Sequence, residues 1–221
     1  MASVAEDLVL LLFDPATGRP IVDGTSLDRA IGGALLLDLS LSGRVTADAE
    51  GAKARLTVVD PSPTGSDVLD AALGTLEGGP VRAQRAVERL ASRTRVPVLE
   101  RLVERGVLER RSERRLGLFP TTAWPAIDPA PRAALRGRLC DVLLKGGRPD
   151  EHLACLVSLL HAVKAEHEIV DGPRRAIRAR AAEITSGEWA GTAVRKAVQS
   201  VQAGVAIAVS VAVSASAASS S

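Results

Sequence analysis

The segment DRAIGGALLLDLSLSGRV, residues 28–45, decides the fold of this chain. Apolar residues cover most of the circumference of a helix drawn through it, which predicts a central helix that is buried on most sides. Gly32 and Gly33 each cost such a helix about 1 kcal/mol relative to Ala. We expect the close approach of a neighbouring backbone to offset that cost.

The ends of this helix carry recognisable signals. Thr25 followed three residues later by Asp28 resembles a capping box and predicts the start, and Gly43 predicts the stop. Asp28, Arg29 and Asp38 interrupt the apolar block, and no stretch of the chain reaches the roughly 18–20 uninterrupted apolar residues of a membrane span. The N-terminus also lacks the basic region of a signal peptide. We therefore expect a cytoplasmic protein that can touch a membrane without crossing it.

The composition is that of a globular protein. The 221 residues are 46% hydrophobic and 24% charged, with only 2% aromatic residues and no Tyr. The core must then consist of Leu, Val, Ala and Ile, which suits closely packed helices. The net charge of +2 is too small to indicate a nucleic-acid partner by itself. Cys140 and Cys155 stand among apolar residues, and we expect both to be buried free thiols.

Apolar periodicity and Gly/Pro breaks divide the chain into short elements. A short apolar element is expected over 5–13, hairpins over 44–60 and 109–120, and helices over 66–76, 80–93, 95–108, 131–145, 150–164 and 173–186. The predicted fold is mainly α, with a central apolar helical bundle surrounded by amphipathic helices and two small β-hairpins. We expect a single domain over 1–203. Residues 204–221 should form an Ala/Val/Ser-rich helix end and a disordered tail.

The residues give no indication of catalysis. His152 and Cys155 lie one turn apart, but His161 is nine positions beyond His152, about half a turn round at 100° per residue, so the set does not converge on a metal. A phosphate-binding glycine loop, a nucleophile elbow and an HExxH motif are all absent from the sequence. We expect neither an enzyme nor a cofactor.

Arginines cluster between residues 93 and 115. The window holds four glutamates and eight arginines: Arg93, Arg95, Arg101, Arg105, Arg110, Arg111, Arg114 and Arg115. Within the helix, Arg101 and Glu104 can partly neutralise each other. One interpretation is a solvated helix face. The other is an anion site, because Arg93 and Arg95 stand at the start of a helix whose N-terminus adds partial positive charge, and guanidinium groups suit phosphate.

Two phosphate ligands fit this cluster. A helix followed by a basic hairpin also describes a winged helix that binds DNA, but we identify no preceding helix pair with a tight turn, and the scarcity of aromatic residues removes stacking platforms for single strands. A lipid headgroup is favoured by Leu116, Leu118 and Phe119, which place apolar side chains beside the arginines. Simple core packing of these three residues is the alternative.

The sequence resembles the Golgi phosphoprotein 3 family and its bacterial, chiefly actinomycete, members. The resemblance covers about residues 5–210 and rests on LVLLLFDPATGRPIVDG, GGALLLDLSLSGRV, LVERGVL and LLHAV, which occur in the family's order. It implies a mostly helical domain with a central bundle. For the eukaryotic members it implies binding of phosphatidylinositol 4-phosphate, an apolar hairpin that aids membrane insertion, and an adaptor role toward glycosyltransferase tails.

The resemblance also implies a headgroup pocket, which this chain matches in part. The family has a Trp and an Arg near the start of the central helix, where this chain has Asp23 and Gly32. Of two basic residues before the LVERGVL helix, one falls on Arg95. The other falls on Ser92, with Arg93 adjacent. These departures put recognition of the 4-phosphate headgroup in doubt and affect general anionic-lipid binding less.

From these observations we predict a non-enzymatic, peripheral membrane protein that binds anionic phospholipid, with phosphatidylinositol 4-phosphate as a candidate. Arg93, Arg95 and Arg29 would bind lipid phosphate, Arg29 standing in for the arginine replaced by Gly32. Leu116, Leu118 and Phe119 would enter the membrane. A winged-helix nucleic-acid module and an interaction scaffold without a lipid role remain the alternatives. The sequence indicates no particular protein partner.

Overall fold

A computed structural model describes residues 3–115, 119–187 and 192–218. Within them the helices are α1 (Val4–Leu12), α2 (Gly24–Leu41), α3 (Asp67–Gly74), α4 (Ala83–Ala91), α5 (Arg95–Glu104), α6 (Ala130–Leu144), α7 (Glu151–Ala162), α8 (Glu166–Ile169), α9 (Arg174–Ser186) and α10 (Thr192–Ala218). The strands are β1 (Val45–Ala47), β2 (Arg55–Val58), β3 (Val81–Arg82), β4 (Arg111–Arg115) and β5 (Phe119–Ala123). The predicted class, mainly α with small β elements, is confirmed.

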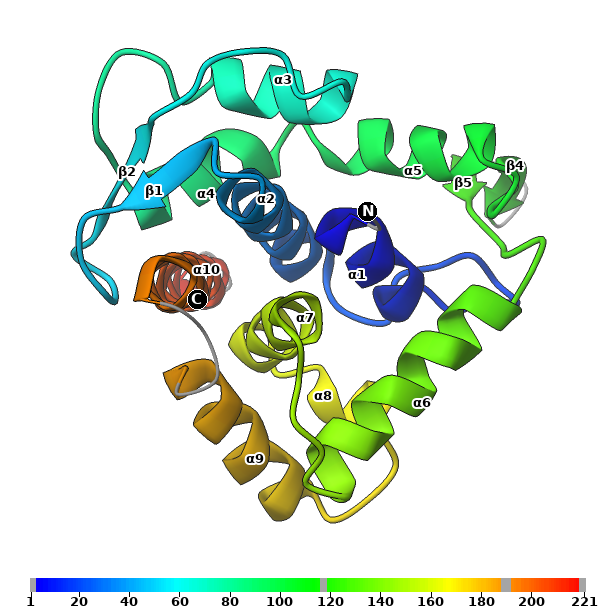
Figure 1. The fold of residues 1–221 in the computed structure, drawn as a ribbon. Coiled ribbons are helices and arrows are strands. Elements are labelled where there is room, and N and C mark those ends of the chain that lie inside the picture. The colour runs from blue at the N-terminus through cyan, green and yellow to red at the C-terminus, as the bar shows by residue number, and fades with distance from the viewer. Residues whose placement is uncertain (1–2, 116–118, 188–191, 219–221) are drawn as a thin grey trace.

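Helix α2 is the centre of the molecule. It contacts α1, α4, α7 and α10, which surround it in Figure 1, while α6, α8 and α9 form an outer layer beyond α7. Five of its six leucines are buried and lie on different sides of the cylinder: Leu27, Leu35, Leu36, Leu37 and Leu39 are each at most 1% exposed. The predicted central core helix is therefore confirmed.

The two adjacent glycines of α2 allow its neighbours to approach closely. A Cβ atom on Gly32 would lie 3.0 Å from the backbone oxygen of Val87 in α4. A Cβ on Gly33 would lie 2.6 Å from a methyl of Val205 in α10. Gly204 of α10 makes the same kind of close contact, because a Cβ there would lie 2.9 Å from the backbone of Gln84 in α4. The three helices α2, α4 and α10 thus contact one another closely at glycines. The expected approach of a neighbouring backbone is confirmed for Gly32, whereas Gly33 faces side chains.

The start of α2 differs from the capping-box expectation. Asp23 is the N-cap, and its carboxylate accepts hydrogen bonds from the backbone N–H groups of Thr25 at 3.0 Å and Ser26 at 2.9 Å. Thr25 lies inside the first turn. The end is as predicted, because Gly43 takes a φ of +72° that L side chains rarely adopt.

The β elements confirm both predicted hairpins and add a strand. β1 pairs with β2 and β4 with β5, both antiparallel. The expectation that Pro80 opens a helix is wrong, because the chain first forms β3 on β2, with Leu56 opposite Val81, and α4 begins only at Ala83. Val81 is 8% exposed, so pairing with β2 buries it before the helix begins.

The glycine contacts give a stability prediction. Replacing Gly32 with Val should lower the free energy of unfolding by about 1–3 kcal/mol, because the added methyl groups overpack the contact with α4. Gly137 in α6 is the matched control, since nothing lies within 4 Å of its Cβ position. Gly137→Ala should raise the stability by up to about 1 kcal/mol through helix propensity. Urea unfolding measures both, and a Gly32→Val protein with an unchanged midpoint would contradict the account.

Candidate functional site

A hollow of about 400 Å³ lies where α5 begins. Its lining comprises Asp28 of α2, Ser92 and Arg93 of the turn after α4, and Arg95 and Val96 of α5. We call it the arginine hollow. The turn is fixed by the buried Thr94, whose hydroxyl donates to the Leu90 carbonyl at 3.0 Å. The structure thus brings Arg93 and Arg95, which the sequence proposed as phosphate ligands, to one site.

Arg95 is largely occupied within the protein. Its Nε donates to a carboxylate oxygen of Asp28 at 2.6 Å, and Nη2 donates to the Gly24 carbonyl. Burial raises the pKa of Asp28 above its usual range, although the neighbouring Arg95 acts in the opposite direction. Both side chains are about 30% exposed. Arg95 therefore joins the start of α5 to the start of α2.

The environment of Arg93 differs from that of Arg95. Its side chain is exposed, and no group among the described residues forms a hydrogen bond or ion pair with it. The first turn of α5 has no side-chain cap, because the Thr94 hydroxyl is bound to Leu90. Val96 is 53% exposed beside them. A free guanidinium, an uncapped helix N-terminus and an apolar side chain therefore face solvent together.

The other residues proposed for the headgroup pocket lie elsewhere on α2. Arg29 does not line the arginine hollow; its Nη1 donates to the Thr25 carbonyl at 3.3 Å, and its buried Nε has no partner among the described residues. Gly32 is buried against α4, so an arginine there would meet the backbone of α4. Asp23 acts as the helix cap. The binding role of Arg29 stays a prediction.

Most of the remaining arginine cluster is paired with carboxylates. The expected Arg101–Glu104 compensation is replaced by Arg101 on Glu6 of α1, at 2.8 Å, where Arg105 also binds. Arg110 contacts Glu100 at 2.8 Å, and its guanidinium lies 5.7 Å from the centre of the Trp124 ring. Arg111 contacts Glu109 at 2.9 Å. Four of these six arginines thus have carboxylate partners, and the side chains of Arg114 and Arg115 lie outside the described part of the chain.

The proposed membrane-inserting hairpin is present as β4 and β5. Arg115 pairs with Phe119 across it. Leu116 and Leu118 fall outside the described residues, and for Phe119 the structure describes the backbone pairing alone. Membrane entry by these residues stays a prediction.

The helix pair that the sequence reading did not identify does exist. The three residues 92–94 connect α4 to α5, and the β4–β5 hairpin follows, which is the chain order of a winged helix. However, β3 pairs with β2 and not with that hairpin. The outer face of α5 also carries Glu100 and the exposed Glu104, which would repel DNA phosphates.

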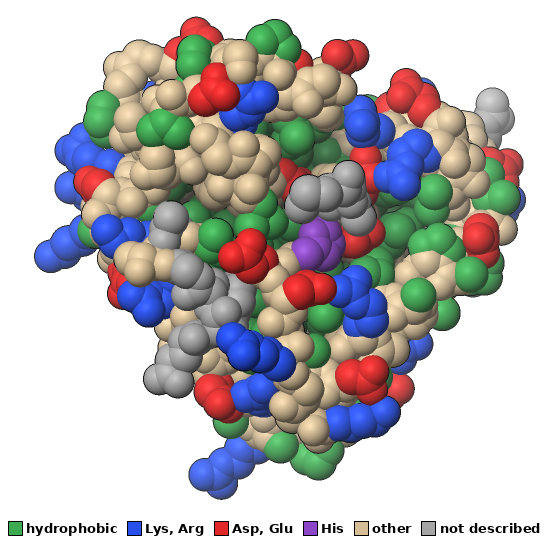
Figure 2. All heavy atoms as spheres, in the orientation of Figure 1, with side chains coloured by type: hydrophobic (Ala, Val, Ile, Leu, Met, Phe, Trp, Pro, Cys, Tyr) green, Lys and Arg blue, Asp and Glu red, His purple; other side chains and the backbone are tan. Residues whose placement is uncertain are grey.

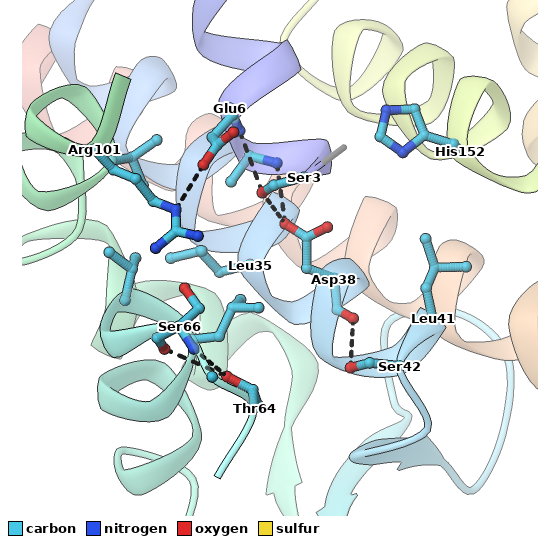
Figure 3. Close-up of a pocket in the computed structure, with 15 residues that line it drawn as sticks. Ser3, Glu6, Leu35, Asp38, Leu41, Ser42, Thr64, Ser66, Arg101 and His152 are labelled. Atoms are coloured by element: carbon cyan, nitrogen blue, oxygen red, sulfur yellow. Dashed lines mark hydrogen bonds and ion pairs between the residues drawn. The ribbon is translucent and has the colours of Figure 1, made fainter. Parts of the chain in front are cut away.

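A second cavity, of about 290 Å³, opens at the other end of α2 (Figure 3). Its polar lining includes Ser3 and Glu6 of α1, Asp38 of α2, Arg101 of α5 and His152 of α7. We call it the Asp38 cavity. In Figure 2 a hollow with apolar walls lies on this face, between the regions of α3 and α5. Sequence reasoning missed it, because these residues come from distant segments that share no motif.

Asp38 caps helix α1 from inside this cavity. Its carboxylate accepts from the Ser3 hydroxyl at 2.7 Å and from the backbone N–H groups of Val4 at 2.8 Å and Ala5 at 3.1 Å. Burial nevertheless raises the pKa of Asp38 above its usual range, with these hydrogen bonds acting against it. Asp38, which sequence reasoning used only to exclude a membrane span, therefore holds α1 against α2.

The histidines and cysteines do not form a common site. His152, His161 and His167 contact Asp7, Glu166 and Glu168, respectively. Within the described residues no group of three or more His, Cys, Asp or Glu side chains is placed to hold a metal ion. Both cysteines are free; Cys155 is buried as expected, whereas Cys140 is only half-buried.

Comparison with protein-family models identifies one, described as Golgi phosphoprotein 3 (GPP34), that matches residues 4–201. No curated protein matches the chain significantly. Among the helices of the described residues, none combines the length and apolar character needed to cross a membrane.

The different states of the two arginines give a stability prediction. Arg95→Ala should lower the free energy of unfolding by up to about 1 kcal/mol, because the half-exposed ion pair with Asp28 is lost. Arg93→Ala should change it by less than about 0.5 kcal/mol, because the side chain has no partner to lose. Urea unfolding of both variants measures the difference, and equal destabilisation would show that Arg93 also has a structural role.

Proposed function

The chain belongs to the Golgi phosphoprotein 3 family, and on that basis we propose that it is a non-enzymatic peripheral membrane protein that binds anionic phospholipid. The site is the arginine hollow. The observation that carries the proposal is the exposed Arg93, which has no partner among the described residues and stands beside the exposed Val96 at an uncapped helix N-terminus.

The chemistry of the hollow matches a phosphate at a membrane surface. The guanidinium of Arg93 supplies several N–H donors with a fixed positive charge. The first turn of α5 adds backbone N–H groups and the positive end of the helix dipole. Val96 supplies an apolar side chain that can enter the interface beside the headgroup. Arg95 contributes by holding α5 in place, and the Asp28 carboxylate compensates its charge.

The finer proposal concerns the headgroup. Phosphatidylinositol 4-phosphate offers a terminal phosphate monoester that can reach into the hollow, whereas phosphatidylserine offers a carboxylate close to the bilayer. The position where the family has a Trp holds Asp23, and the position where it has an Arg holds Gly32. We therefore propose binding to anionic lipids in general, with a modest preference for the phosphoinositide.

Vesicle co-sedimentation tests the site. Arg93→Ala should reduce the partition coefficient on anionic vesicles roughly fivefold, because one basic residue near such a surface contributes about 1 kcal/mol. The Arg93→Ala/Arg95→Ala protein should lose more. The charge-matched control is Arg174→Ala/Arg175→Ala, which removes two exposed arginines from α9.

The outcomes separate the candidate functions. Equal partition on phosphatidylcholine and anionic vesicles, or equal losses in the hollow and α9 variants, would contradict the proposed site. A gel shift with duplex DNA that weakens linearly with the logarithm of salt concentration, together with no vesicle binding, would favour the nucleic-acid alternative. Failure to bind either ligand would leave an interaction scaffold.

The hairpin is tested separately. If Leu118 and Phe119 enter the bilayer, then Leu118→Ser/Phe119→Ser should weaken vesicle binding at high salt, where the charge contribution is screened. The free energy of unfolding should remain close to that of the wild type. A large loss of stability would instead indicate that these side chains belong to the core.

A further inference from the structure

We propose that the Asp38 cavity binds a small amphipathic organic anion, with its carboxylate or phosphate head on Arg101 and its aliphatic part against the apolar wall. The proposal is independent of lipid binding at the arginine hollow. The two sites lie at opposite ends of α2, since Asp28 and Asp38 are ten residues apart, or about 15 Å along a helix.

The hydrogen bonds that the lining residues already make decide whether the cavity favours an anionic or a cationic ligand. Both oxygens of the Glu6 carboxylate are occupied, one by Arg101 Nε and the other by Arg105 Nη1. Both oxygens of Asp38 also accept hydrogen bonds, from Ser3 and from the first N–H groups of α1. The carboxylates of the cavity therefore already have donor partners, which lowers the attraction of the cavity for a cationic ligand.

The groups left over are donors. Arg101 lines the cavity and uses only Nε on Glu6; among the described residues its two terminal nitrogens have no partner. In Figure 3 these nitrogens point away from Glu6, toward Ser66. Ser66 is the N-cap of α3, but its side chain makes no capping hydrogen bond. A guanidinium edge and a hydroxyl on one side of a cavity form a site for an oxyanion.

The net charge around the guanidinium of Arg101 also favours an anionic ligand. Glu6 is 4% exposed and is shared by two arginines, so the three side chains together carry one net positive charge. Arg101 itself is 40% exposed, which leaves its terminal nitrogens accessible to a ligand from solvent. The negative charge of Asp38 is directed at the N-terminus of α1, whose dipole compensates it.

Much of the remaining lining of the cavity is apolar and forms its apolar wall. It consists of Leu35 and Leu41 of α2, Val68 and Leu69 of α3, and Val98 of α5. A bare inorganic anion would leave this wall in contact with water, whereas a short aliphatic chain would cover it and gain about 25 cal/mol per Å² of apolar area removed from water. The volume of about 290 Å³ suits a single chain of about eight carbons and not a whole phospholipid.

The test is a binding titration with free ligands below their micelle concentrations, in the absence of vesicles. Octanoate and octyl phosphate are the two anionic probes. Octylammonium and octanol are controls with the same chain and a positive or neutral head. Acetate and inorganic phosphate are controls with the anionic head and no long chain. We expect the two anionic probes to bind and to shift the methyl NMR signals of Leu35, Val68 and Val98. The preferred head distinguishes a carboxylate from a phosphate ligand.

The matched variants are Arg101→Gln and Arg105→Gln. Each removes one of the two partners of Glu6, but only Arg101 lines the cavity. Arg101→Gln should weaken octanoate or octyl phosphate binding at least tenfold, and Arg105→Gln should change it less than twofold. Val68→Phe, which fills the cavity, should abolish binding of both, whereas Arg93→Ala should leave it unchanged.

Several results would overturn the proposal: no binding by either anionic probe, octylammonium binding as tightly as octanoate, equal losses in the two arginine variants, or heads without chains binding equally well. Unfolding measurements on each variant keep a folding defect from being mistaken for lost binding. Because vesicles are absent, failure here leaves the lipid proposal standing, and failure of vesicle binding leaves this one standing.

Discussion

The close contact of three helices at glycines is the constraint on which this structure depends. Gly32 admits the backbone of α4, Gly33 admits side chains of α10 and α7, and Gly204 brings α10 onto α4. Dispersion and apolar burial at such short distances replace the large aromatic side chains that most cores use. A chain with 2% aromatic residues can therefore bury the middle of α2, residues 30–37, completely, provided that its neighbours can reach the helix backbone.

The contact between Gly32 and the end of α4 also determines the position of the arginine hollow. Leu90 and Ala91, the last residues of α4, lie against Gly32, so the turn that follows them has a fixed origin beside α2. Arg95 then returns to Asp28 and Gly24 and secures α5 to the start of α2. Arg93, between these two anchors, projects into solvent on a rigid base. The packing around Arg93 leaves its side chain without a partner among the residues that the structure describes.

Much of the fold could be predicted from sequence, because apolar periodicity and glycine breaks are local signals. The central helix, both hairpins and the α5 start at Arg95 follow from them. β3 could not be anticipated, since Pro80 reads as a helix start until the pairing of Val81 with Leu56 is known. Asp23 and Thr25 are both acceptable helix caps, and only the path of the chain before α2 chooses between them.

The site was less predictable, because charge partners are set by tertiary structure. The run of arginines between residues 93 and 115 resembles a single basic surface, yet the carboxylate of Glu6, some 95 residues earlier, binds two of its members. Arg93 and Arg95 are only two residues apart and yet have different environments, which spacing alone does not show. The Asp38 cavity combines five elements, and its polar residues come from distant segments with no spacing that would place them together.

Helix α5 connects the arginine hollow with the Asp38 cavity. Arg95 forms an ion pair with α2, and Arg101 and Arg105 form ion pairs with Glu6 of α1. The inner face of α5, which consists of Val98, Leu99 and Leu102, is buried. Arg95 and Arg101 are six residues apart, or about 9 Å along the helix, so a single element contributes a guanidinium to each of the two sites.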